Sequence, residues 1–93
     1  MSLNFVISGP LRELAGNVGE LRLDGEARSL DDALALLWSA YPSFRDRVLT
    51  ERGEVRQHIN IFVDGESIRF SGGFATPVRD RSEIVILPAL SGG

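Results

Sequence analysis

The sequence contains neither cysteine nor lysine, and each absence removes a kind of chemistry. Without cysteine, the chain can form no disulfide and can carry no sulfur as a side-chain persulfide, and a reducing cytoplasm is the setting that we expect. All 10 basic residues are arginine, so no side-chain ε-amine could react with an activated carboxylate of the chain itself. A GC-rich codon bias is the simpler explanation for the missing lysine.

Residues that commonly form catalytic or metal sites are also scarce. The single histidine, His58, has no neighbouring carboxylate or thiol in the sequence, so we interpret it as solvated or structural rather than as a general base. Two histidines or a set of cysteines would be needed for a metal site. Gly72-Gly73 lacks the Lys and Ser/Thr of a phosphate loop. We therefore expect a protein that is not an enzyme and binds no cofactor or metal.

The bulk composition fits one compact domain over residues 1–93. Hydrophobic residues make up 43% of the chain and charged residues 25%, which favours a single folded core. No apolar run approaches the roughly 20 residues that cross a bilayer, and the start of the chain does not resemble a signal peptide. The net charge is -3 and the arginines are scattered. We expect neither a membrane nor a nucleic acid as a partner.

Short alternating apolar segments predict strands, and one longer segment predicts a helix. The predicted strands cover residues 3–8, 20–23, 58–63, 66–70 and 83–87. Ser29 is a typical helix N-cap, and Asp32 three residues later resembles a capping box. The apolar stripe that follows ends at Pro42, which cannot continue a helix. Residues 11–17 and 43–49 predict single turns of helix, and residues 50–57 predict a loop.

This order of elements predicts an α+β fold with one mixed sheet. A hairpin, a crossover helix and three further strands are typical of the β-grasp (ubiquitin-like) fold, with one main helix on one face of five strands. Asp64-Gly65 favours a hairpin turn. The segment 83–87 is apolar on both faces, as a central strand should be, and we expect it to lie beside the first strand and parallel to it.

The end of the chain holds the one group that we expect to react. It reads Pro88-Ala89-Leu90-Ser91-Gly92-Gly93, and we expect a flexible tail over residues 88–93. Glycine has no Cβ, so Gly92-Gly93 could enter a narrow channel of a partner. A terminal carboxylate is an anion at neutral pH, so a nucleophile attacks it only after activation, for example as an acyl-adenylate. Because the chain has no nucleotide site, that activation requires a partner enzyme.

Three segments carry a resemblance to a known family. They are Leu11-Arg12-Glu13-Leu14-Ala15-Gly16, residues 59–77, and residues 84–93. The sequence resembles the ubiquitin-like sulfur-carrier proteins of the MoaD/ThiS family, and its C-terminal half is most similar to CysO-like carriers. The family's usual D-G-D-x-V turn is replaced by Asp-Arg-Ser-Glu-Ile over residues 80–84, and Ser91 stands where alanine is usual.

The resemblance implies a mechanism and a set of partners. An E1-like adenylating enzyme of the MoeB/ThiF type would activate Gly93 with Mg-ATP, and a sulfur donor would convert it to a thiocarboxylate. In a CysO-like carrier the acceptor would be an aminoacrylate on a pyridoxal-phosphate cysteine synthase. In a MoaD-like small subunit the tail would enter the large subunit of molybdopterin synthase. A ubiquitin-like protein modifier and a β-grasp interaction domain with inert glycines are the remaining alternatives.

The predicted site consists of the tail and a surface that partners would contact. Gly93 is the predicted site of adenylation and thiocarboxylate formation, and Leu90, Ser91 and Gly92 would lead it into the partner. The predicted partner interface comprises Arg12, Phe62, Arg69, Phe70, Phe74 and Pro88. Arg12 matches a family arginine that pairs with the activating enzyme. Core packing is an equal alternative for each of the three phenylalanines.

Overall fold

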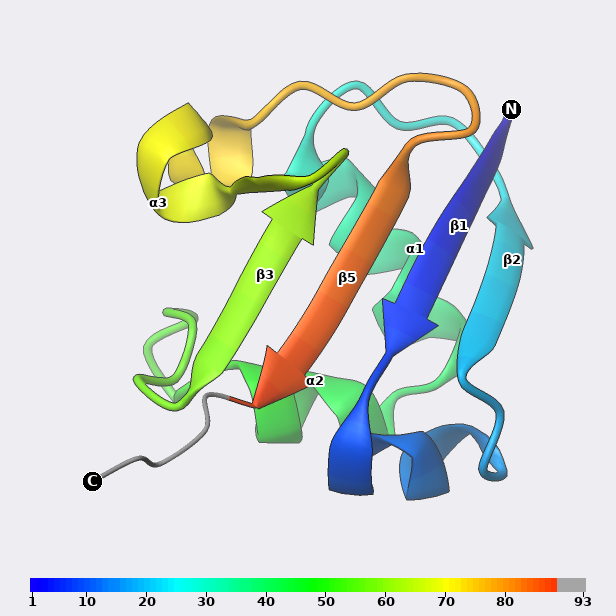
Figure 1. Ribbon diagram of the computed structural model, residues 1–93, viewed down its shortest axis with the longest axis vertical. Coiled ribbons are helices and arrows are strands. Elements are labelled where there is room, and N and C mark those ends of the chain that lie inside the picture. Colours follow the sequence, from blue (N-terminus) through cyan, green and yellow to red (C-terminus); the bar gives the residue numbers. More distant parts are fainter. Residues whose placement is uncertain (89–93) are drawn as a thin grey trace.

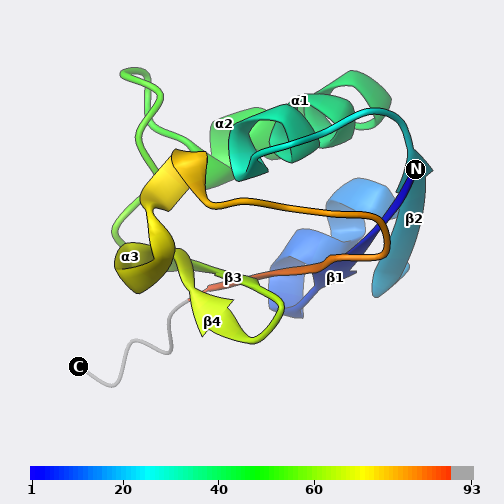
Figure 2. The same ribbon diagram turned by 90° about the horizontal axis from the view of Figure 1, so that it is seen from above.

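The computed structural model describes residues 1–88, which form a five-stranded mixed sheet with helices on one face (Figures 1 and 2). The strands are β1 (Ser2–Ile7), β2 (Glu20–Asp24), β3 (Ile59–Val63), β4 (Glu66–Ser67) and β5 (Glu83–Pro88). Their order in the sheet is β2-β1-β5-β3-β4. β5 is central, parallel to β1 and antiparallel to β3. The predicted α+β, β-grasp fold is confirmed.

The main helix is α1 (Leu30–Ala40), which begins where its capping residue predicts. The Ser29 Oγ accepts a hydrogen bond from the Asp32 N–H at 3.3 Å. Asp32 Oδ2 in turn accepts a hydrogen bond from the Arg28 N–H at 3.1 Å. In a reciprocal capping box the donor would be the N–H of the N-cap itself, Ser29, one residue later. Tyr41 follows the helix as its C-cap, directly before Pro42. A polar residue at the N-cap and a proline after the C-cap thus set the length of α1.

The core lies between α1 and the inner face of the sheet. Leu30, Ala33, Leu34 and Leu37 form the buried stripe of α1. They pack with Phe5 and the other inward residues of β1 and β5, which are Leu3, Ile7, Ile84 and Ile86. Each buried leucine contributes about 1.5–3 kcal/mol to stability, so this contact fixes α1 on the sheet. Figure 2 shows α1 and α2 (Ser43–Val48) on the same side of the sheet.

The prediction of a fourth strand over residues 66–70 is wrong after Ser67. Asp64 and Gly65 both have positive φ and form the predicted two-residue turn, but β4 has only two residues. The Ser67 side chain accepts a hydrogen bond from the Arg69 N–H at 3.3 Å and starts α3 (Ile68–Ser71). Gly72, with φ of 117°, ends it. A serine cap and a C-terminal glycine therefore override the strand pattern.

Several shorter segments differ from the expected turns and loop. The segment after β1 is the 3₁₀ helix η1 (Gly9–Ala15), and a second 3₁₀ helix, η2 (Gly73–Ala75), follows α3. The predicted turn over 43–49 is the full helix α2. In the predicted loop over 50–57, Val55 forms an isolated bridge to Leu49. No helix within residues 1–88 is long and apolar enough to cross a membrane.

Candidate functional site

The C-terminal end of β5 is held by contacts on both sides. Pro88 lies opposite Ile59 of β3. On the other side, the Ser8 N–H donates to the Ile86 carbonyl at 3.2 Å. Gly9 has a φ of 65°, and a Cβ at this position would lie only 3.3 Å from Pro88 Cγ. The glycine therefore lets the turn after β1 pack closely against Pro88, a role that sequence reasoning missed.

The predicted tail residues Leu90, Ser91, Gly92 and Gly93 lie outside the described residues, which end at Pro88. The structure nevertheless places the start of the tail. Pro88 is the last residue of the central strand and lies at the end of the sheet where η1 and the start of β3 are found. The predicted interface residue Pro88 thus marks the point where the tail begins.

The outer face of the sheet, opposite the helices, carries an apolar row beside this point. Val85 of β5 is the cross-strand partner of both Phe62 of β3 and Val6 of β1. All three side chains are half-buried, as is Leu87, the next outward residue of β5. We call Val6, Phe62, Val85 and Leu87 the apolar row. A half-buried apolar surface of this kind suits contact with another protein.

Of the apolar row, only Phe62 was among the predicted interface residues. Sequence reasoning missed Val6 and Val85. Each is an apolar residue on the outward face of its strand, but the sequence did not show that the two faces form one surface. Strand register decides this, because Val6, Val85 and Phe62 stand in one row only when β5 lies between β1 and β3.

Arg12 lies at the tail end of the sheet, on η1. Its Nε donates to the carbonyl of Ile7, the last residue of β1, at 3.5 Å. The guanidinium lies over Gly19, where a Cβ would be 3.2 Å from Arg12 Nη2. The residue is otherwise exposed. The structure thus holds Arg12 close to the end of β1, where Ile7 pairs with Ile86. In this position the charge of Arg12 is accessible to a partner.

The remaining predicted interface residues, Arg69, Phe70 and Phe74, lie on α3 and η2 at the other end of β3. Phe70 is 83% exposed, and Arg69 is also exposed. Phe74 instead packs partly against the core. The structure therefore separates the predicted interface, with Arg12 and Pro88 at one end of the sheet and Arg69, Phe70 and Phe74 at the other. Phe62 lies between these groups, since it pairs with Val85 of β5 and with Ser67, the N-cap of α3.

Within residues 1–88, no group of three or more His, Cys, Asp or Glu side chains could hold a metal ion. His58 is exposed at the start of β3. Every buried polar side-chain atom of these residues has a hydrogen-bond partner, so none is left aimed at an absent ligand. The candidate site is accordingly the start of the tail together with the apolar row.

Comparison with known proteins decides the family. The model of the ThiS family matches residues 5–93, which is nearly the whole chain. The chain belongs to the ThiS family. The match covers all three segments that carry the resemblance in the sequence, the C-terminal glycines included. Proteins similar to this ThiS-family chain are small sulfur carriers and ubiquitin-like modifiers.

Two relatives and one solved structure show how far the similarity extends. The sulfur carrier protein CysO of Mycobacterium tuberculosis is 32% identical over 98% of this chain and 100% of its own length. Small archaeal modifier protein 1 of Haloferax volcanii is 37% identical over 89% of this chain and 91% of its own. In the crystal structure of the Amycolatopsis orientalis BexX/CysO complex, the matching chain superposes with a TM-score of 0.85. That match is 27% identical and covers 98% of this chain and 99% of the other.

Proposed function

We propose that this ThiS-family chain is a sulfur carrier whose reactive group is the α-carboxylate of Gly93. The observation that carries the proposal is the position of Pro88, which ends the central strand beside the apolar row and directly precedes the last five residues of the sequence. Gly92-Gly93 offers no side chain to obstruct a narrow channel, and the family match extends through both glycines. We assign the chemistry of activation and sulfur transfer to partner enzymes.

The proposed cycle begins with activation by an E1-like adenylating enzyme. The Gly93 carboxylate attacks the α-phosphate of Mg-ATP, which forms an acyl-adenylate and releases pyrophosphate. A sulfur donor of the persulfide or sulfide class then attacks the acyl carbon, and AMP leaves. Cleavage of the donor's S–S bond by a thiol, where a persulfide is used, leaves a thiocarboxylate. The carrier's own residues bind and orient: the apolar row docks, and Pro88 fixes where the tail starts.

We further propose that the thiocarboxylate serves cysteine synthesis of the CysO type. The support is the similarity to CysO, which extends over nearly the full length of both chains. In this pathway the thiocarboxylate sulfur attacks an aminoacrylate held by a pyridoxal-phosphate enzyme. An acyl shift and peptidase cleavage then release cysteine and restore the Gly93 carboxylate.

Intact mass spectrometry tests the carrier proposal directly. The purified chain is incubated with the E1-like enzyme of the same organism, Mg-ATP and a sulfide or persulfide source. We expect the mass to rise by the difference between sulfur and oxygen, with the change confined to the C-terminal peptide. A chain that keeps its mass while the same enzyme and ATP modify a CysO control would contradict the proposal.

A ubiquitin-like modifier is the second candidate, and the similarity to small archaeal modifier protein 1 favours it. In that case the activated Gly93 would form an isopeptide bond with lysine side chains of other proteins. Expression of the tagged chain in its own cells, followed by peptide mass spectrometry, separates the two functions. Glycine-glycine remnants on target lysines would identify a modifier, and a thiocarboxylate without such remnants would identify a carrier.

A further inference from the structure

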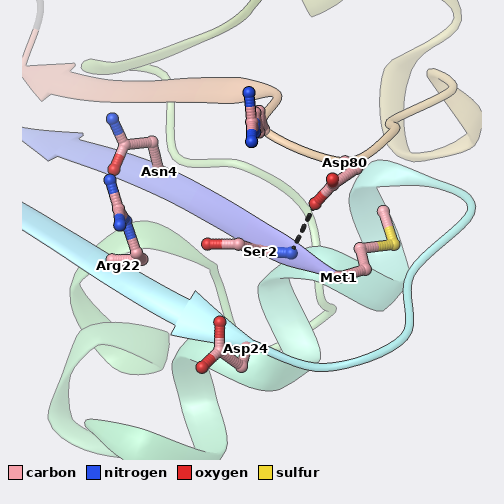
Figure 3. A pocket seen from close by; sticks show the side chains of 7 residues that line it. Met1, Ser2, Asn4, Arg22, Asp24 and Asp80 are labelled. Atoms are coloured by element: carbon pink, nitrogen blue, oxygen red, sulfur yellow. Dashed lines mark hydrogen bonds between the residues drawn. The ribbon is translucent and has the colours of Figure 1, made fainter.

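A second feature of the outer face lies at the end of the sheet where β5 begins. It is a cleft with a volume of about 610 Å³ (Figure 3). Its walls come from β1, β2 and the loop before β5, and its lining residues are Met1, Ser2, Asn4, Arg22, Asp24, Asp80 and Arg81. The first five residues of β5 separate this cleft from Pro88, a span of about 17 Å. The proposed chemistry at Gly93 therefore does not use it.

The loop that carries Arg81 is fixed to β1 by three hydrogen bonds, two of them between backbone atoms. The Ser2 N–H donates to Asp80 Oδ1 at 2.8 Å, as Figure 3 shows. The Arg81 N–H donates to the Ser2 carbonyl at 2.6 Å, and the Asn4 N–H donates to the Ser82 carbonyl at 3.0 Å. These bonds hold Arg81 at a φ of 69°, a backbone region that glycine enters readily and arginine rarely. A long cationic side chain is thus held at a rigid and strained position.

The cleft offers guanidinium donors that are not used within the fold. Arg22 is exposed and stands opposite Asn4 on the outer face. Among residues 1–88, the ion pair that forms joins Arg45 and Asp46, so neither Arg22 nor Arg81 is paired with Asp24 or Asp80. A guanidinium presents a planar fork of N–H donors that matches a carboxylate. Arg22 and Arg81 can therefore both bind an external carboxylate.

The two aspartates of the cleft limit which anion it favours. Asp80 already accepts a hydrogen bond from Ser2, but its charge and that of Asp24 remain. Their repulsion weakens the attraction of a small free anion such as phosphate. A carboxylate fixed on a protein that already covers the neighbouring surface needs less intrinsic affinity, because its effective concentration is high. The fit to an acidic side chain of a bound partner therefore rests on the two guanidinium groups and on this high effective concentration, because the two arginines and two aspartates of the cleft balance in charge.

We propose that the cleft binds an Asp or Glu side chain of the adenylating enzyme that docks on the apolar row. This inference rests on the proposed function. The two surfaces are continuous, since Asn4 and Val6 are successive outward residues of β1, and Val6 pairs with Val85. A partner that covers the apolar row and receives the tail at one end thus meets Arg22 and Arg81 at the other. The two contacts together fix the orientation of the carrier.

Isothermal titration calorimetry with the E1-like enzyme of the same organism tests this contact at low and high salt. We expect Arg22→Gln and Arg81→Gly each to weaken binding about fivefold at low salt. Because salt screens exposed ion pairs, both variants should also reduce the salt dependence of the affinity. Arg52→Gln, which removes an exposed arginine from the 50–57 loop, is the matched charge control and should bind like wild type. Arg81→Gly removes backbone strain, so weaker binding could not be attributed to unfolding.

The outcomes separate this inference from the proposed function. Wild-type affinity and salt dependence in the Arg22→Gln/Arg81→Gly double variant would overturn the cleft contact and leave the carrier function in place. Competition by inorganic phosphate at constant ionic strength, lost in the double variant, would show a free-anion site and would also overturn it. If wild type does not bind the enzyme, or if Val85→Asp binds as tightly as wild type, then the proposed docking fails as well.

Discussion

The carboxylate of Asp64, in the turn between β3 and β4, accepts a hydrogen bond from the hydroxyl of Ser82 at 2.9 Å, although 18 positions separate them. Ser82 is only 2% exposed, and its Oγ also accepts from the Arg79 N–H at 2.9 Å. The other Asp64 oxygen accepts from the Glu83 N–H at 2.9 Å. The hairpin turn thereby fixes the start of β5, the strand whose other end leads into the tail.

Replacing Ser82 with alanine should destabilise the fold. The change removes two part-buried hydrogen bonds, one from the Arg79 N–H and one to an Asp64 oxygen. We expect the free energy of unfolding to fall by about 1–3 kcal/mol, measured by urea denaturation. Ser39→Ala, on the exposed surface of α1, is the control and should change it little. Equal stability of the two variants would show that the contact contributes nothing.

The Asp64–Ser82 contact also shows where prediction from sequence ended. The Asp64-Gly65 turn was predicted from local preference, since both residues tolerate positive φ. The hydrogen-bond partner of the Asp64 side chain was not predicted, because no local sequence pattern indicates which distant residue a turn will face. The same limit applies to Gly9 and Pro88, whose close contact exists only once β1 and β5 are paired. The central place of β5, parallel to β1, was predicted from the order of the elements, whereas these side-chain contacts depend on the register.

Arg81→Gly should stabilise the isolated chain. Arginine at a φ of 69° pays a steric cost that glycine avoids, and the hydrogen bonds of the loop involve backbone atoms that glycine retains. The greater freedom of glycine in the unfolded chain offsets part of this gain. We expect a net increase of about 0.5–1 kcal/mol in the free energy of unfolding. Thermal and urea denaturation measure it, and a loss of stability would mean that the Arg81 side chain makes compensating contacts.

Phe70→Ala should separate partner binding from stability. Phe70 is 83% exposed, so its removal should change the free energy of unfolding by less than about 0.5 kcal/mol. Phe44, which is fully buried and meets the Tyr41 ring edge-on at 6.0 Å, is the contrasting position. Phe44→Ala should cost about 3–5 kcal/mol. Exposed aromatic residues are frequent anchors of interfaces, so pull-down with the adenylating and acceptor enzymes should show weaker binding of Phe70→Ala to at least one of them.

Deleting Gly93 should abolish activation without unfolding the chain. The buried apolar residues of the described chain lie between Leu3 and Ile86, so the core is unchanged and the melting temperature should match that of wild type. The new terminal carboxylate, on Gly92, would have a reach shorter by about 3.5 Å. A misplacement of a reacting group by about 1 Å can lower a reaction rate about a hundredfold. We therefore expect the rate of thiocarboxylate formation to fall at least about a hundredfold. Ser91→Ala keeps the length of the tail and should react like wild type, and normal activation of the shortened chain would show that Gly93 is not the reacting residue.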